Sequence, residues 1–184
     1  ERIRGPIKQL LGPGYTLSKH NDANLYVGDT EWHPDLGWDP SIPGGKNDPE
    51  WIAGRRGRNH YVPSIKVAFY LDPVTKDTGC LRVIPGSHRA GEPFADTVQE
   101  HIRKIPDTWG VEGAGLPAVA LETRPGNVAV FNHNLKHAAF GGSSRRRMFT
   151  INCCQRYREA DLPRFRDYIS AHARFWSDRL YGET

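Results

Sequence analysis

The stretch YVPSIKVAFYLDPVTKDTGCLRVIPGSH, residues 61–88, decides the fold class. Its first part, 61–73, is rich in β-branched and aromatic residues and predicts a strand. KDTG (76–79) has the composition of a hairpin-type turn, and CLRVIPGSH (80–88) predicts a second strand that ends in a turn. The stretch therefore favours an antiparallel β protein.

The same pattern continues in both directions along the chain. One or two strands are predicted between Tyr15 and Trp32, and two more within 118–134, around the turn Pro125-Gly126-Asn127. KHAAF (136–140) and RRRMFTINCCQRY (145–157) predict a further strand pair. Strands at short spacing, with few helices and no alternation of strand and helix, indicate an antiparallel sandwich or barrel.

Helices are expected at three places: a short turn at 4–14, a helix at 95–105 and an amphipathic C-terminal helix at about 161–181. The length of 184 residues predicts a single domain, 1–184. Because the first residue is Glu1 and not Met, we expect the domain to be truncated at its N-terminus. Residues 36–59 predict a long loop, and a loop of this length in a compact domain is usually functional or mobile.

The composition describes a soluble globular protein, with 38% hydrophobic and 25% charged residues. No apolar run is long enough to predict a membrane span. The three cysteines have no framework spacing, which predicts reduced thiols and a cytoplasmic protein. The net charge of +4 is mild, so we interpret the clusters GRRGR (54–58) and RRR (145–147) as solvated surface and expect no nucleic-acid partner.

His33 and Asp35 suggest chemistry because residues i and i+2 of an extended segment point to one face of a sheet. A histidine and a carboxylate are two of the three ligands in the facial triad of non-haem Fe(II). The third ligand must come from elsewhere; the candidates are His60, His88, His101, His133, His137 and His172. Two of these, His101 and His172, fall on predicted helices, where a surface or packing role is expected.

Three segments in this order resemble the phytanoyl-CoA dioxygenase family of Fe(II)- and 2-oxoglutarate-dependent oxygenases. They are the H-x-D pair, TGCLRVIPGSHR (78–89) and RPGNVAVFNHNLKHAAFGGSSRRRMFTINC (124–153). The resemblance covers about Leu25 to Tyr157. It implies a mainly β fold, a double-stranded β-helix (a jelly-roll or cupin-like barrel) with a few flanking helices. The sequence departs from the family pattern at Asn127, where aspartate is usual, and in HAAFGG (137–142).

The resemblance also implies site residues. His33, Asp35 and His137 correspond to the iron ligands, while His133 fits less well because small residues do not follow it directly. An arginine beyond His137 corresponds to the one that grips 2-oxoglutarate. Alternation along 145–153 groups Arg146 with Thr150 and Asn152, a polar face that favours Arg146. Arg147 is the alternative, because a one-residue shift exchanges the two faces.

The resemblance implies a dioxygenase that uses Fe(II), O2 and 2-oxoglutarate to hydroxylate a C–H bond of a small organic molecule or acyl conjugate. Loop 36–59 would form a lid, and Arg55, Arg56 and Arg58 would suit an anionic substrate if they are not merely solvated. A halogenase is disfavoured, because relatives of that type replace the carboxylate that Asp35 supplies. A non-catalytic barrel that binds metal or nucleic acid is the remaining alternative.

Overall fold

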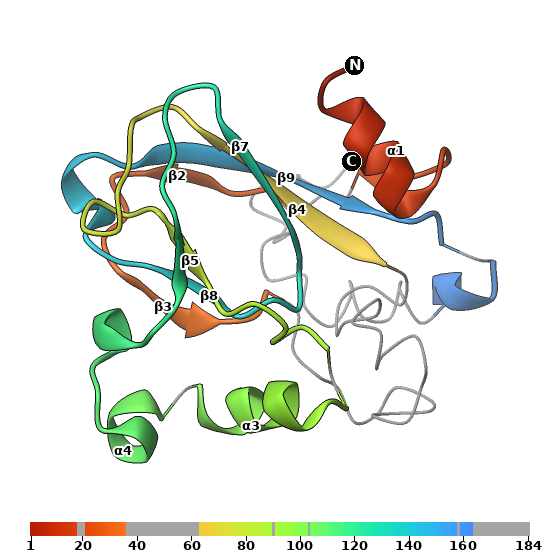
Figure 1. The fold of residues 1–184 in the computed structure, drawn as a ribbon. Coiled ribbons are helices and arrows are strands. Elements are labelled where there is room, and N and C mark those ends of the chain that lie inside the picture. Colours follow the sequence, from red (N-terminus) through yellow and green to blue (C-terminus); the bar gives the residue numbers. More distant parts are fainter. Residues whose placement is uncertain (18–20, 36–62, 90, 103, 158, 164–184) are drawn as a thin grey trace, which may run out of the picture.

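A computed structural model describes residues 1–17, 21–35, 63–89, 91–102, 104–157 and 159–163. Two antiparallel sheets face each other across a shared core (Figure 1). The larger sheet has the order β1-β9-β4-β7, with β2 also paired to β9. Its strands are β1 (Thr16–Leu17), β2 (Ala23–Leu25), β4 (Ser64–Tyr70), β7 (Val128–Asn132) and β9 (Arg147–Cys154).

The smaller sheet has the order β3-β8-β5-β6. Its strands are β3 (Thr30–His33), β5 (Leu81–Val83), β6 (Val119–Leu121) and β8 (His137–Ala139). From β2 to β9 the chain changes sheet at every connection except the one between β5 and β6. This winding between two sheets is the double-stranded β-helix, and it confirms the expected fold class.

Strand β4 lies at the centre of the larger sheet and pairs with β7 on one side and β9 on the other. Its alternation sends Ile65 and Val67 to the outer face and Ala68 and Tyr70 to the inner one. Because both faces are covered, six of its seven residues are buried. A strand covered on both faces is expected to be mostly apolar, and SIKVAFY departs from this at Ser64 and Lys66, which are both buried.

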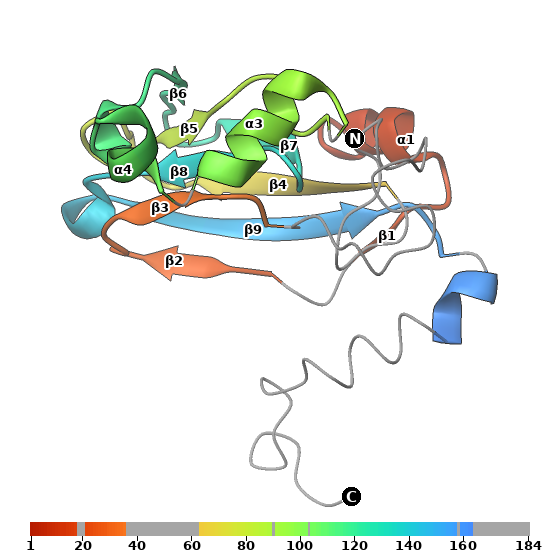
Figure 2. The ribbon, with the colours of Figure 1, turned by 90° about the horizontal axis from the view of Figure 1, so that it is seen from below.

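Helices cover the outer faces of the sheets (Figure 2). Helix α1 (Arg4–Leu11) packs Ile7 and Leu11 on the outer face of the larger sheet and ends at Gly12, whose φ of 87° favours glycine. Helices α3 (Pro93–His101) and α4 (Ile105–Trp109) lie over the smaller sheet. Short 3-10 turns complete the described elements: η2 (Gly113–Gly115), η3 (Gly142–Ser144) and η4 (Glu159–Asp161).

Three details differ from the sequence prediction. The turns at 76–79 and 125–127 do not form hairpins, because β4 and β5, and likewise β6 and β7, lie in different sheets. For the same reason β8 and β9 do not form the strand pair expected from 136–140 and 145–157. The helix expected at 95–105 ends at His101, and α4 then begins with Pro106 in its first turn. Proline fits a first turn but not a helix interior, so a single helix does not continue through this segment.

Other expectations fall on residues outside those that the structure describes. They are the lid-like loop 36–59, with Arg55, Arg56 and Arg58, and all but the first three positions of the helix at about 161–181. Within the described residues, no helix is long and apolar enough to cross a membrane.

Candidate metal centre

His33 and His137 come together because β3 and β8 are neighbours in the smaller sheet. His33 ends β3, His137 begins β8, and the two residues are register partners in the antiparallel pair. Their ring centroids lie 4.4 Å apart. Trp32, between His33 and the start of β3, points to the opposite face, where it is buried and donates an indole hydrogen bond of 2.7 Å to the Gly113 carbonyl. That anchor holds the end of β3 in place.

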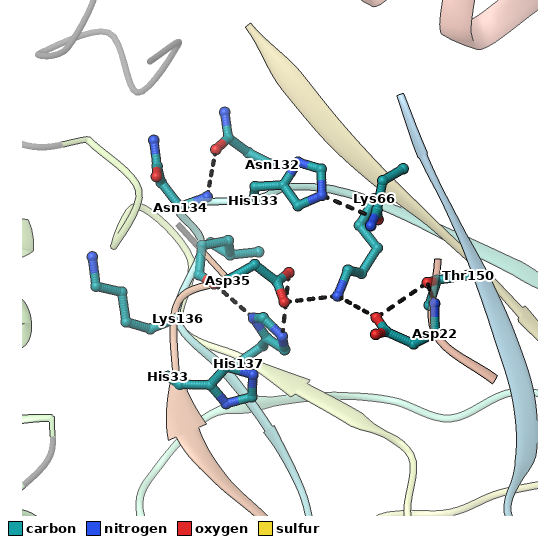
Figure 3. Close-up of polar contacts among 12 residues, drawn as sticks. Asp22, His33, Asp35, Lys66, Asn132, His133, Asn134, Lys136, His137 and Thr150 are labelled. Atoms are coloured by element: carbon teal, nitrogen blue, oxygen red, sulfur yellow. Dashed lines mark hydrogen bonds and ion pairs between the residues drawn. The ribbon is translucent and has the colours of Figure 1, made fainter. Parts of the chain in front are cut away.

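Asp35 completes a cluster of three possible metal ligands with these two histidines. One ligand atom from each of the three residues lies within 4.8 Å of the others. Oδ2 of Asp35 lies 3.7 Å from Nε2 of His137 and, although buried, has no hydrogen-bond partner (Figure 3). A buried carboxylate oxygen without a partner is costly, and a bound cation would satisfy it.

Both imidazoles present the correct nitrogen for metal binding. Nδ1 of His137 lies 2.8 Å from the Leu135 carbonyl, and Nδ1 of His33 lies 2.6 Å from the Glu31 carbonyl. Because a carbonyl oxygen can only accept a hydrogen bond, Nδ1 carries the proton in each ring. The lone pair is then on Nε2, which can bind a metal. The hydrogen bond from Nδ1 to the carbonyl fixes the orientation of the ring, as is usual for histidine ligands.

The charges in the cluster suit a divalent cation. Burial lowers the pKa of His137 to about 4, so its imidazole is neutral and free to donate at neutral pH. Burial alone would raise the pKa of Asp35, but His137 and Lys66 hold it below its ordinary value. Two imidazoles and one carboxylate match the donor set of the facial triad, so the residues fit a non-haem Fe(II) ion.

The other candidate histidines that the structure describes do not join the cluster. Nε2 of buried His133 lies 3.1 Å from Oδ1 of Asn152, and His101 packs edge-on against Trp109. His88 belongs to the turn that follows β5, where the neighbouring Ser87 binds Lys136. His60 and His172 lie outside the described residues. Of the candidates that the structure describes, His137 alone lies with His33 and Asp35.

A cavity of about 340 Å³ extends from the three ligands into the barrel. Its polar lining includes Thr30, Lys66, Tyr70 and Arg146, and its apolar lining includes Leu81, Phe131 and Met148. Burial raises the pKa of Tyr70 to about 12, so its phenol stays protonated. The cavity therefore combines the candidate metal centre with an arginine and a phenol in one partly apolar space.

Arg146 lies inside the barrel and Arg147 outside it, as the polar face of β9 predicts. Arg146 is 3% exposed, and its Nη2 donates to the carbonyls of Val27 and Gly28 at 3.2 and 3.1 Å. Its buried Nε has no hydrogen-bond partner, and Arg146 forms no ion pair with any carboxylate in the part of the chain that the structure describes. Arg147 instead forms a two-pronged salt bridge to Asp72 at the surface.

Lys66 is a site residue that the sequence analysis missed. It comes from the centre of β4 and points inward, 8% exposed, with Nζ 2.7 Å from Oδ1 of Asp35 and 3.0 Å from Oδ2 of Asp22 (Figure 3). Burial alone would lower the pKa of Lys66, but the two carboxylates raise it. A sequence signal exists, because a charged residue in the middle of SIKVAFY cannot reach solvent from a strand covered on both faces.

Comparison with protein families gives a match over most of these elements. The model of the family described as phytanoyl-CoA dioxygenase matches residues 26–149, which include His33, Asp35, His137 and Arg146. Among curated proteins, the dioxygenase lolE1 of Epichloe uncinata is 26% identical over 139 residues, 75% of this chain and 50% of lolE1. An uncharacterised protein of Mycobacterium tuberculosis is 32% identical over 92 residues, 50% of this chain and 28% of that protein. The chain thus spans half or less of the length of these relatives.

Solved structures share the fold at low sequence identity. AviO1 from Streptomyces viridochromogenes Tue57 has a TM-score of 0.52 and 16% identity, and the match covers 84% of this chain and 57% of AviO1. SnoN, a non-haem α-ketoglutarate-dependent epimerase from nogalamycin biosynthesis, has a TM-score of 0.51 and 21% identity over 84% of this chain and 54% of SnoN. These likenesses show the double-stranded β-helix.

Proposed function

Because the chain belongs to the phytanoyl-CoA dioxygenase family, we propose that it acts as an Fe(II)- and 2-oxoglutarate-dependent dioxygenase. The reaction would hydroxylate a C–H bond of a small organic molecule or acyl conjugate and release succinate and CO2. The observation that carries the proposal is that the clustered His33, Asp35 and His137 line the same cavity as Arg146.

The three side chains would hold Fe(II) on one face and leave its other positions open. The bound ion would supply the activation of O2 that is coupled to decarboxylation of 2-oxoglutarate. The carboxylate of Asp35 offsets part of the charge of the ion, and the fixed Nδ1–H bonds keep both imidazoles aimed at it. The protein therefore contributes a prearranged donor set.

Arg146 would bind the carboxylate of 2-oxoglutarate that lies farther from the metal. Its Nε is buried without a partner, so a carboxylate in the cavity would satisfy a donor that is otherwise lost. The guanidinium fork suits a carboxylate because two parallel charge-assisted bonds can form. Thr30, whose Oγ1 lies 3.3 Å from Arg146 Nη2, borders the same place. Apolar neighbours such as Leu81 and Met148 keep water from competing for the pair.

The cavity residues support a small-molecule substrate. That this substrate is anionic was expected from Arg55, Arg56 and Arg58 and stays a prediction, because these residues lie outside the described part of the chain. Halogenase activity is disfavoured, because Asp35 occupies the position where chloride would need room. A non-catalytic barrel would leave unexplained why three ligands and an inward arginine share one cavity.

The direct test is formation of succinate from 2-oxoglutarate by the purified protein with Fe(II) and O2. We expect turnover that requires all three components and rises when a correct substrate is added from a panel of small molecules and acyl conjugates. Tight metal binding with no succinate under any of these conditions would instead support the non-catalytic alternative.

A further inference from the structure

We propose that Lys66 is a positioning residue, which holds Oδ1 of Asp35 so that this carboxylate offers a metal ion only Oδ2. The inference rests on the proposed function and deepens it. Two observations carry it: Nζ of Lys66 lies 2.7 Å from Oδ1, while Oδ2 is buried without a hydrogen-bond partner beside His137 (Figure 3). One oxygen of the carboxylate is therefore held by the ammonium, and the other is left for a metal ion.

The ammonium is itself held firmly. A second carboxylate, Asp22, accepts a bond from Nζ at 3.0 Å through its Oδ2. Thr150 fixes Asp22 twice: the Thr150 hydroxyl donates to Oδ2 at 3.3 Å, and the Asp22 backbone N–H donates to the same hydroxyl oxygen at 2.9 Å. The backbone N–H of Thr150 also donates to the Asp22 carbonyl at 2.8 Å. A chain of contacts thus runs from β9 through Asp22 and Lys66 to Asp35.

A lysine suits this position better than an arginine. The ammonium is a compact charge that can take one carboxylate oxygen, whereas the guanidinium fork tends to take both. With one oxygen held, Asp35 binds an ion through a single bond. Three single protein bonds would leave room on the ion for 2-oxoglutarate and O2. If Asp35 chelated through both oxygens, part of this room would be lost.

The competing explanation is that Lys66 only ties β2 to β4 through Asp22. The two roles are separable, because Asp22 contacts the ammonium but Asp35 alone belongs to the ligand cluster. Asp22→Asn removes the outer charge but keeps a side-chain oxygen that can accept from Nζ, so Lys66 stays on Asp35 and the variant serves as the matched control. Lys66→Met keeps an unbranched side chain that is one atom shorter and removes the ammonium donor.

The experiment measures binding of 2-oxoglutarate to Mn(II)-saturated protein without O2, by calorimetry, for the wild type and both variants. We expect Asp22→Asn to bind 2-oxoglutarate within about threefold of the wild type, and Lys66→Met to bind at least about tenfold more weakly. Saturating Mn(II) removes any difference in metal affinity from the comparison. Folded Lys66→Met that binds within about threefold of the wild type would overturn the inference.

A crystal structure of the wild-type protein with Mn(II) decides the matter even if Lys66→Met fails to fold. We expect one oxygen of Asp35 to be bonded to Mn(II) and the other to be held by Lys66. Two oxygens bonded to Mn(II), or a Lys66 that has moved away from Asp35, would refute the positioning role. If Asp35 binds Mn(II) in the expected way but the protein does not bind 2-oxoglutarate, the proposed function fails and the positioning role stands. Absence of bound Mn(II) from the wild type would overturn both.

Discussion

His33 and His137 face each other as register partners on β3 and β8, with ring centroids 4.4 Å apart. Asp35 follows two residues after His33, and one of its oxygens lies within 4.8 Å of a ring nitrogen of each histidine. This short-range arrangement across two strands makes the metal centre depend on the pairing of β3 with β8.

Replacing Asp35 with alanine should abolish metal binding and succinate formation, because it removes the only anionic donor of the cluster. A metal that binds only the folded protein stabilises it by about 2.7 kcal/mol when the free metal concentration is about a hundred times Kd. We expect Mn(II) to raise the thermal midpoint of the wild type and to leave Asp35→Ala unchanged. His101→Ala, on α3, is a control that should still respond; an equal shift in Asp35→Ala would contradict the assignment.

Arg146→Lys should raise the KM for 2-oxoglutarate at least about tenfold, equivalent to about 1.4 kcal/mol of lost binding. Lysine keeps the charge but lacks the fork that can hold a carboxylate with two bonds. Arg147→Lys is the matched control, since this side chain lies at the surface on Asp72 and should leave the KM unchanged. Steady-state kinetics distinguish the two; an effect from Arg147→Lys alone would show that the inward face has been misassigned.

The stability of the metal-free protein should fall as the pH is lowered from about 6.5 to about 4. Burial depresses the pKa of His137 from 6.5 to about 4, so within this window the unfolded chain binds a proton that the folded chain does not. Acid therefore favours the unfolded state. His137 lowers the free energy of unfolding by at most about 3 kcal/mol over this window, since one pKa unit corresponds to about 1.36 kcal/mol. The pKa of His133 is depressed by burial in the same direction and adds to the slope.

Urea unfolding at several pH values, with a chelator present, measures this dependence. His137→Gln should show a shallower loss of stability between pH 6.5 and 4, because one of the imidazoles with a depressed pKa is gone. Identical slopes for the wild type and His137→Gln would indicate that His137 titrates normally in the folded protein.

Gly142→Ala should weaken binding of 2-oxoglutarate and lower stability. A Cβ at Gly142 would lie 2.6 Å from the Val27 carbonyl oxygen and 2.9 Å from Nε of Arg146, so the turn or the guanidinium must move. Gly28→Ala is the control, because a Cβ there meets nothing within 4 Å although the Gly28 carbonyl also contacts Arg146. We expect a KM change of several-fold or more only for Gly142→Ala, and equal KM values for both variants would refute the steric argument.

Local sequence determined those features that depend on side-chain alternation along one strand. The spacing of His33 and Asp35 put them on one side, and the alternation along 145–153 sent Arg146 inward and Arg147 outward. The strands themselves followed from β-forming composition and turn residues. These predictions succeed because the two-residue period of a strand is a property of its own backbone.

Tertiary structure alone decided which strands pair and hence which distant side chains meet. The turns at 76–79 and 125–127 suggested hairpins, but each carries the chain from one sheet to the other. His133 and His137 follow the same strand, yet only the register of β8 against β3 brings His137 to His33, while His133 lies beside Asn152. Lys66 likewise meets Asp35 and Asp22 only in the folded barrel. The period of a strand fixes the face on which a residue lies, but the partner on that face depends on long-range pairing, which no local pattern encodes.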